Sequence, residues 1–287
     1  MGESADAKLN LGRIEYLNVF PIYYPLENGI IPNPFNIIRG VPSYLNGLAA
    51  KGELDMSPVS SIEYARNAPL YYIVPDLSIS SFGKVQSVLL LSRAPVDQLS
   101  GKKVLVSSHS HTSVGLLRIL SRMRYNVELE FETSAFPTGG ARNELPDAFL
   151  SIGDEALRLG GSGIYPEVLD LGAAWYDWTG LPFVFAVWVV RKKAVEEKNG
   201  QLGLALEALL ASKKWGCSNI ERICEAAVGA GVLNIAQLRE YYRCLRYDLN
   251  DKERAGLELF YSCLAQIGEL ERAPRPEVYR PLASVAA

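Results

Sequence analysis

Two short segments rich in serine and threonine hold the side chains best suited to bind a carboxylate. They are Ser57–Ser61 (SPVSS) and Ser107–Ser113 (SSHSHTS), and each leads into a segment with helical periodicity. A helix N-terminus presents unpaired N–H groups and a partial positive charge, and nearby hydroxyls add donors. Capping accounts for one hydroxyl per helix, at about 1 kcal/mol each. Because the hydroxyls outnumber the caps, we predict two anion sites, one per segment. Their residues are Ser60 and Ser61 in the first, and Ser110, Thr112 and Ser113 in the second.

Asn18 and Ser87 are single polar residues at positions that a ligand could reach. Asn18 follows the strand-like run Leu9–Tyr16 and precedes a turn at Pro21, where an asparagine either satisfies the turn backbone or faces a cleft. Ser87 lies inside the apolar run Val85–Leu91 (VQSVLLL) and must find a hydrogen-bond partner if it is buried. We predict that both side chains contact a ligand.

Three titratable side chains lie in loops before predicted helices. Asp154 follows Gly153 and either caps a helix or acts at the mouth of a cleft, and capping is the simpler interpretation. His109 and His111 have a side chain that titrates near neutrality. No Ser-His-Asp or Cys-His pattern accompanies them, so we expect loop donors or exposed residues.

The segment Asp170–Trp188 (DLGAAWYDWTGLPFVFAVW) combines aromatic residues with a buried strand. We expect an irregular aromatic stretch up to a turn at Thr179–Pro182, followed by a strand that is apolar on both faces. Ligand pockets are mostly apolar with a few polar groups, so Trp175 is a candidate for a pocket wall. The alternative is that the tryptophans complete a core.

Strands and helices alternate along most of the chain. Short apolar runs at 9–16, 35–39, 54–58 and 70–79 are separated by helical segments, and the same pattern recurs at 102–107, 112–122, 127–133, 148–152 and 155–159. From 201 to 267 the periodicity is helical, and prolines at 274, 276 and 281 predict a disordered or draped tail. This alternation is typical of α/β sheets that are mainly parallel.

Two apolar runs, at 85–91 and from 183, are positioned to carry the chain between two such units. We therefore predict an α/β protein of two lobes with a ligand cleft between them. The first lobe comprises residues 1–93 and 183–287, including a C-terminal helical segment, and the second comprises residues 94–182. Ligands of open α/β sheets bind beyond the carboxyl ends of the strands, where the polar loops lie.

Composition excludes several classes of partner. The 287 residues carry a formal net charge of −3, which offers no field to attract nucleic acid or an anionic membrane. We find neither a secretory signal nor an apolar run near the ~20 residues of a membrane span. The spacing of the four cysteines fits no metal or redox motif, and there is no HxxxH pattern, so we expect no metal and a cytosolic protein with reduced thiols.

Six motifs resemble one family of enzymes. They are YLNVFP (16–21), GELDMSPVSSIEYAR (52–66), SVLLLSR (87–93), SHTSVGLLR (110–118), IGDEAL (152–157) and the segment at 170–188. In this order they are similar to the chorismate dehydratases of the futalosine route to menaquinone. The similarity runs from about residue 9 to 191 and is less distinctive in the helical tail. It implies the fold of type II periplasmic solute-binding proteins, with two crossover strands.

The resemblance implies a cofactor-independent lyase that removes water from chorismate to give 3-[(1-carboxyvinyl)oxy]benzoate. Chorismate is a dicarboxylate, which suits two anion sites and an aromatic wall. On this basis Ser60, Ser61, Thr112 and Ser113 bind carboxylates, and Asn18 and Ser87 contact the ring hydroxyl or the departing proton. The base is either a protein group or a substrate carboxylate. Neither histidine is assigned a catalytic role.

Two alternatives to the dehydratase differ in their chemistry. One is the sister enzyme that forms 1,4-dihydroxy-6-naphthoate on the same fold, whose first loop resembles Cys-Pro-Asn-Asp, whereas this chain has Tyr16–Pro21 (YLNVFP). The other is a non-catalytic solute-binding protein for a small carboxylate, which the absence of an export signal disfavours. We expect a small dicarboxylate as the partner, and neither nucleic acid nor a membrane.

Overall fold

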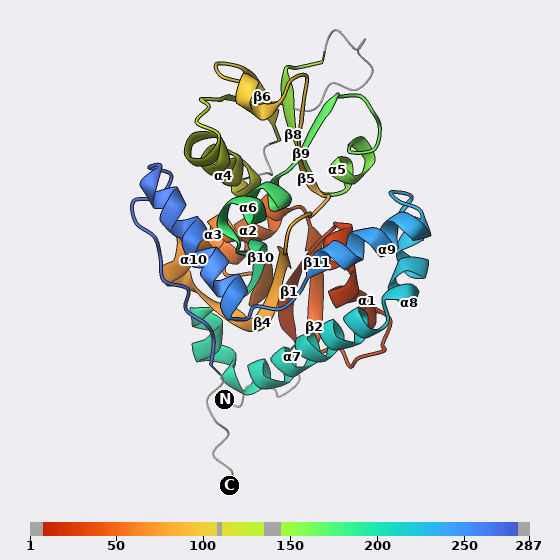
Figure 1. Cartoon of the computed structure of the whole chain (residues 1–287). Helices are drawn as coiled ribbons and strands as arrows, with labels where there is room; N and C mark the ends of the chain where they lie inside the picture. The colour runs from red at the N-terminus through yellow and green to blue at the C-terminus, as the bar shows by residue number, and fades with distance from the viewer. Residues whose placement is uncertain (1–7, 108–110, 135–144, 281–287) are drawn as a thin grey trace.

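The chain folds into two lobes, each built around its own β-sheet (Figure 1). The computed structural model describes residues 8–107, 111–134 and 145–280. The larger lobe carries the chain start and the C-terminal helices, and the smaller lobe lies above it in Figure 1. This architecture confirms the predicted α/β fold class.

The sheet of the larger lobe has six strands in the order β11-β4-β10-β3-β1-β2. The strands β1, β2 and β3 run parallel, and β10 runs antiparallel to β3 and β4. Their bounds are β1 Leu9–Ile14, β2 Phe35–Gly40, β3 Met56–Ser60, β4 Tyr71–Ser81, β10 Phe183–Arg191 and β11 Leu245–Arg246. The central strand β10 is buried along nearly its whole length, as its continuous Val- and Phe-rich sequence predicts.

The sheet of the smaller lobe has five strands in the order β7-β6-β8-β5-β9. The strands are β5 Val88–Ser92, β6 Lys103–Val106, β7 Glu130–Thr133, β8 Ala148–Ile152 and β9 Glu167–Asp170. The strand β5 is antiparallel to both of its neighbours, β8 and β9, while β6 is parallel to β7 and β8. The strand β9 was not predicted, because it is a four-residue edge strand in which no residue is fully buried.

Helices cover both sheets, and those after β10 form the predicted C-terminal helical segment (Figure 1). The helices are α1 Phe20–Glu27, α2 Pro42–Lys51, α3 Ser61–Asn67, α4 His111–Ile119, α5 Gly153–Leu159, α6 Leu171–Thr179, α7 Lys192–Ser218, α8 Ile220–Ala227, α9 Ile235–Cys244 and α10 Asp251–Gln266. Local sequence explains several ends. Pro42 lies in the first turn of α2, and Asn234 and Asn250 form capping boxes at the starts of α9 and α10.

The chain crosses between the lobes twice. It leaves the first sheet after Ser81 and enters the second at β5, and it returns between α6 and β10. The expected first lobe extended to residue 93, whereas β5 lies in the second sheet; the run 85–91 is therefore divided between a connecting segment and a strand. Asp170, at the end of β9, anchors the first crossing, because its carboxylate accepts hydrogen bonds from the N–H groups of Val85 and Gln86 at 3.0 and 2.7 Å.

The aromatic stretch before β10 is helical, which corrects the predicted irregular segment. Asp170 caps α6 by accepting from the N–H of Ala173 at 3.0 Å, and Gly180 ends the helix in the left-handed conformation at φ 69°. The predicted tail is draped along β4 at residues 277–279. There the N–H of Ile73 donates to Glu277 O, and the N–H of Tyr279 donates to Ile73 O.

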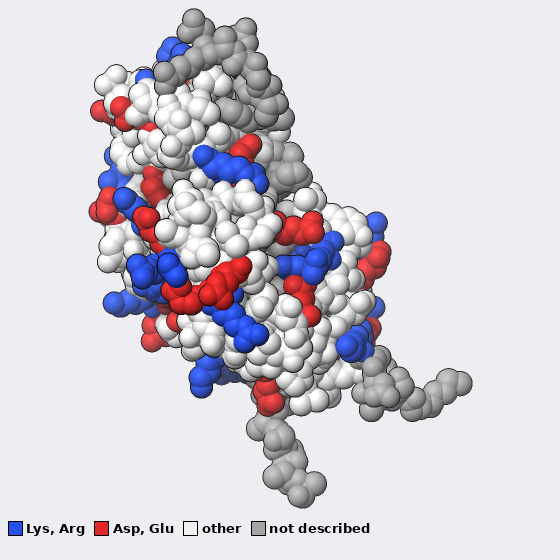
Figure 2. Space-filling model, turned by 90° about the vertical axis from the view of Figure 1, so that its right-hand side faces the viewer, with Lys and Arg blue, Asp and Glu red and all other residues white. Residues whose placement is uncertain are grey.

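Charges of both signs are interspersed over the face of the molecule shown in Figure 2, and neither sign gathers into one large patch there. The four cysteines are free thiols. In the part of the chain that the structure describes, no helix combines the length and the apolar character needed to cross a membrane.

Candidate active site between the lobes

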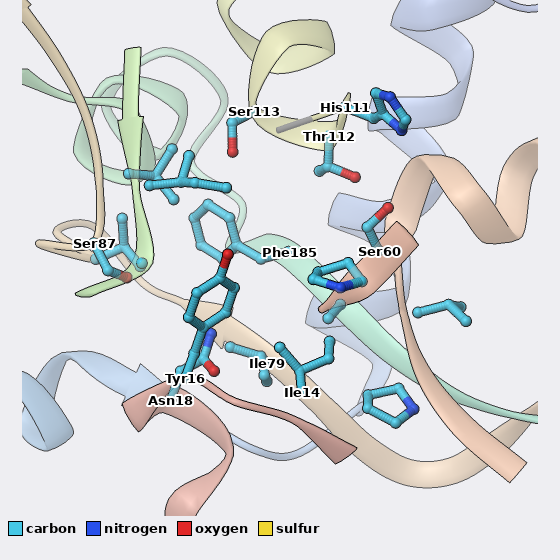
Figure 3. A pocket seen from close by; sticks show the side chains of 18 of the residues that line it. Ile14, Tyr16, Asn18, Ser60, Ile79, Ser87, His111, Thr112, Ser113 and Phe185 are labelled. Atoms are coloured by element: carbon cyan, nitrogen blue, oxygen red, sulfur yellow. The ribbon is translucent and has the colours of Figure 1, made fainter. Parts of the chain in front are cut away.

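A pocket lies where the two lobes meet, and its polar side chains come from both (Figure 3). Its empty space is about 940 Å³, open solvent at the mouth included. The lining residues are Ile14, Tyr16, Asn18, Pro42, Ser43, Asn46, Pro58, Val59, Ser60, Ile79, Val85, Ser87, Val88, His111, Thr112, Ser113, Ile152, Gly153, Phe185 and Ala186. The structure thus brings Asn18, Ser60, Ser87, Thr112 and Ser113 together.

Asn18 belongs to a short 3-10 turn, Leu17–Val19, that follows β1. Three hydrogen bonds from distant parts of the chain hold this turn. The Leu17 N–H donates to Asp154 Oδ1 at 3.2 Å, and the hydroxyls of Tyr242 and Tyr247 donate to the carbonyls of Leu17 and Asn18 at 3.1 and 2.9 Å. Asn18 Oδ1 itself is buried and has no hydrogen-bond partner among the described residues. Because buried polar atoms normally have a partner, an unpaired amide oxygen on a residue that lines a pocket is a candidate contact for a ligand.

Ser87 lies at the first crossing, just before β5, and is 4% exposed. The Tyr241 hydroxyl donates to Ser87 Oγ at 3.2 Å, which supplies the partner that a buried serine requires. The Gly153 N–H donates to the Ser87 carbonyl at 2.8 Å and fixes the backbone. Burial raises the pKa of Tyr241, so its phenol stays protonated and able to donate.

The two hydroxyl-rich segments converge on this one pocket. Thr112 in the first turn of α4 accepts a hydrogen bond at Oγ1 from the N–H of Ile62 in α3, at 3.0 Å. This bond links the two segments for which we predicted one anion site each, across the two lobes. Ser60 occupies the N-cap position of α3, yet its side chain makes no capping hydrogen bond. Its hydroxyl and that of Ser113 both lie at the pocket wall (Figure 3).

Four other candidate residues have different surroundings. Ser61 is fully buried and donates to the Val184 carbonyl at 2.5 Å. Asp154 supports the turn of Asn18 through Leu17 rather than lining the pocket. Trp175 is fully buried in the core. Ser110 lies outside the described residues, as does His109, while His111 is exposed at the rim of the pocket.

The aromatic wall consists of Tyr16 and Phe185, neither of which the sequence analysis selected. Trp175 stands behind this wall, since its ring lies 5.3 Å from that of Phe183, which in turn lies 4.7 Å from Phe185. The register of β10 against β4 shifts between Val184 and Ala186, so the period of two along the strand did not reveal which face Phe185 takes. The residues Pro42, Ser43 and Asn46 of α2 had no signal in the sequence either, because only the fold brings α2 to the pocket.

The pocket is mostly apolar, and its polar side chains are not strongly charged. Its described lining contains no aspartate, glutamate, lysine or arginine. Burial raises the pKa of Tyr16, and the nearby carboxylates of Asp154 and Glu155 raise it further, so its hydroxyl remains a donor in the middle of the pocket (Figure 3). Burial also raises the pKa of Asp154, opposed by the Leu17 hydrogen bond. The described residues contain no cluster of three or more histidine, cysteine or acidic side chains that could hold a metal ion.

The two-lobed fold, the double crossing and the pocket between the lobes define a protein of the periplasmic-binding-protein-like class. A solved structure of this class, the periplasmic aliphatic sulphonate binding protein SsuA of Escherichia coli, aligns with a TM-score of 0.66 at 15% identity, covering 96% of this chain and 92% of that chain. Residues 9–266 match the family described as "Menaquinone biosynthesis". The chain belongs to this menaquinone biosynthesis family.

Two relatives from Thermus thermophilus are similar over most of the chain. Chorismate dehydratase is 29% identical over 276 residues, covering 88% of this chain and 94% of the relative. The 1,4-dihydroxy-6-naphthoate synthase is 26% identical over 263 residues, covering 89% and 93%.

Proposed function

We propose that this protein is a chorismate dehydratase, a hydro-lyase that converts chorismate to 3-[(1-carboxyvinyl)oxy]benzoate without a metal or redox cofactor. Family membership and the dehydratase relative support this assignment. The observation that carries it is the buried, unpartnered Asn18 Oδ1 in the same pocket as the Ser87 hydroxyl. A cytoplasmic location belongs to the same proposal, because four free thiols suit a reducing compartment.

Neutral donors bind the two carboxylates of chorismate in this proposal. Thr112 and Ser113 lie in the first turn of α4, whose N-terminus adds N–H groups and a partial positive charge. Ser60 faces the same space with a hydroxyl that is not used for capping. The rings of Tyr16 and Phe185 provide the apolar surface against which the planar part of the substrate packs.

The reaction breaks two bonds on adjacent ring carbons. One carbon carries the enolpyruvyl ether and loses its hydrogen as a proton, and its neighbour loses the hydroxyl. The electron pair of the C–H bond forms the new ring double bond as the C–O bond breaks, and the proton and the hydroxide leave as water. Asn18 Oδ1 accepts from the substrate hydroxyl and orients it, while Ser87 donates to its oxygen as the C–O bond breaks. Aromatisation of the ring favours the elimination.

A carboxylate of the substrate is our choice for the base. The described pocket lining offers no aspartate, glutamate or lysine, and Tyr16 stays protonated because burial raises its pKa. His111 at the rim is the competing candidate. His111→Gln should keep most of the turnover if the substrate supplies the base, and a loss of about a hundredfold or more would assign the proton transfer to the histidine.

The test is to incubate the purified protein with chorismate and to follow the products by chromatography and mass spectrometry. A product lighter by one water, with benzoate-like absorption, is expected from the wild type and much less of it from Asn18→Ala. Chorismate alone is the blank, and Ser262→Ala, on α10 where the hydroxyl donates to Glu258 O, is the matched surface control. Unchanged chorismate would refute the proposal. If chorismate only raised the melting temperature, a binding protein would be the better assignment.

A further inference from the structure

Three tyrosines close to one another in sequence make hydrogen bonds to the segments that carry Asn18 and Ser87. Tyr241 and Tyr242 lie near the end of α9 and Tyr247 follows β11, and all three side chains are buried. Tyr242 and Tyr247 donate to backbone carbonyls of the Asn18 turn, whereas Tyr241 donates to a side chain, Ser87 Oγ. We propose that Tyr241 is a positioning residue that directs the Ser87 hydroxyl proton toward the substrate. This inference rests on the proposed dehydration.

The direction of the Tyr241–Ser87 hydrogen bond follows from the chemistry of the two hydroxyls. A phenol, with a pKa near 10 in water, is a far stronger acid than an aliphatic alcohol and so is the better donor. Burial keeps the Tyr241 phenol protonated. Ser87 Oγ, at 3.2 Å, therefore serves as the acceptor. A hydroxyl that accepts at its oxygen keeps its single proton for another partner, and the pocket lies beside it.

The hydrogen bond from Tyr241 to Ser87 also strengthens the hydrogen bond that Ser87 donates to the substrate. A hydroxyl that accepts one hydrogen bond is polarised and donates a better one, and in a low-dielectric site this effect is larger than in water. The Tyr241 O–H thus makes Ser87 a better donor to the hydroxyl that leaves the substrate. The proton of Tyr241 stays on its own oxygen throughout, so the chain orients and polarises without transferring a proton.

The end of α9 is anchored firmly enough for this task. The capping box of Asn234 and Gln237 fixes the start of the helix. Near its end, Gln86 Nε2 reaches Cys244 Sγ at 3.3 Å, so α9 holds the residue just before Ser87 as well. The Gly153 N–H fixes the Ser87 carbonyl at 2.8 Å. Backbone and side chain of Ser87 are therefore held by different elements, and the phenol governs the side chain.

The experiment is a double-mutant cycle in the full chain with chorismate as substrate, using Tyr241→Phe, Ser87→Ala and the double variant. The control is Tyr23→Phe, since Tyr23 is equally buried and its hydroxyl donates to a backbone carbonyl, Gly12 O, at 2.6 Å. We expect Tyr241→Phe to lower kcat about tenfold with KM nearly unchanged. In the Ser87→Ala background the same change should have little further effect on kcat, because no hydroxyl remains to be oriented.

The outcomes separate positioning from simple packing. Tyr23→Phe should lower the melting temperature, and any effect it has on kcat should multiply with that of Ser87→Ala. If Tyr241→Phe behaves in the same way, with its effect on kcat unchanged in the Ser87→Ala background, the positioning role is overturned. Wild-type kcat in Tyr241→Phe also overturns it while leaving the dehydration intact. No turnover by the wild type would instead overturn the proposed function and this role with it.

Discussion

Gly153 is the residue at which a single methyl group would disturb both candidate catalytic side chains. Its N–H donates to the Ser87 carbonyl at 2.8 Å, and the next residue, Asp154, accepts from the Leu17 N–H of the Asn18 turn. It has φ +60°, and an added Cβ would lie 3.1 Å from two ring atoms of Tyr16. Gly153→Ala therefore combines backbone strain with a close steric contact to Tyr16 in the pocket wall.

The expected size of the effect has two parts. A left-handed conformation costs a non-glycine residue about 1–2 kcal/mol of folding free energy. For a protein of this size each kcal/mol corresponds to about 2–4 °C in melting temperature. To relieve the 3.1 Å contact, Tyr16 must also move by a few tenths of an ångström. A displacement of about 1 Å can cost 10²-fold in rate, so we expect kcat to fall by about tenfold.

Gly163→Ala is the matched control, because Gly163 has a similar φ of +65° but nothing within 4 Å of an added Cβ. Both variants should lose comparable stability, measured by thermal unfolding, and only Gly153→Ala should lose kcat in the chorismate assay. Equal kcat in the two variants would show that the contact of the added Cβ with Tyr16 does not disturb the catalytic side chains. A loss of kcat in both would point to general destabilisation.

Three further predictions concern single side chains. Ser113→Ala should raise KM for chorismate about tenfold, about 1.4 kcal/mol, with little change in kcat; an unchanged KM would end its carboxylate assignment. Ser61→Ala should lower the melting temperature, because the Val184 carbonyl loses its donor at about 1–3 kcal/mol, yet keep KM; a raised KM would return Ser61 to the site. Burial raises the pKa of Asp154, so its contribution to stability is present at low pH and is lost as pH rises through the folded-state pKa. The activity should depend on pH in the opposite direction, because the protonated carboxyl of Asp154 is a poorer acceptor for the Leu17 N–H. We therefore expect kcat to fall at acidic pH. Asp154→Asn should flatten the acidic limb of the pH profile of kcat.

The sequence was sufficient for the two-lobed α/β class and for most of its strands, because the signals for these are local or periodic. Val and Phe runs marked β10, Pro42 and Gly52 bounded α2, and the family motifs implied the two lobes. Asn18 and the hydroxyl-rich segments were found because they follow strands, and such residues lie at the carboxyl ends of the sheet. The structure brings them to one pocket.

What the sequence could not supply are the contacts between distant segments. Ser61 and Thr112 look alike as residues before helices, but Ser61 turns into the core toward Val184, while Thr112 lines the pocket and accepts from Ile62. Trp175 has the composition of a pocket wall, yet the capped helix α6 directs it against Phe183 instead. Which face a side chain takes depends on packing partners far away in sequence.

The pocket is closed by hydrogen bonds that themselves join the lobes. The Ile62 N–H donates to Thr112 on one side, and on the other the Leu17 N–H donates to Asp154. Each bond contributes only about 1 kcal/mol net, and the Arg118–Glu269 ion pair and the apolar packing of α4 against α3 and α10 also hold the lobes together. A ligand that bridges Asn18 in one lobe and Ser113 in the other would add to the free energy that holds the lobes together. The same residues that form the site thus also set how readily it opens, because Thr112 and the Asn18 turn contribute to both.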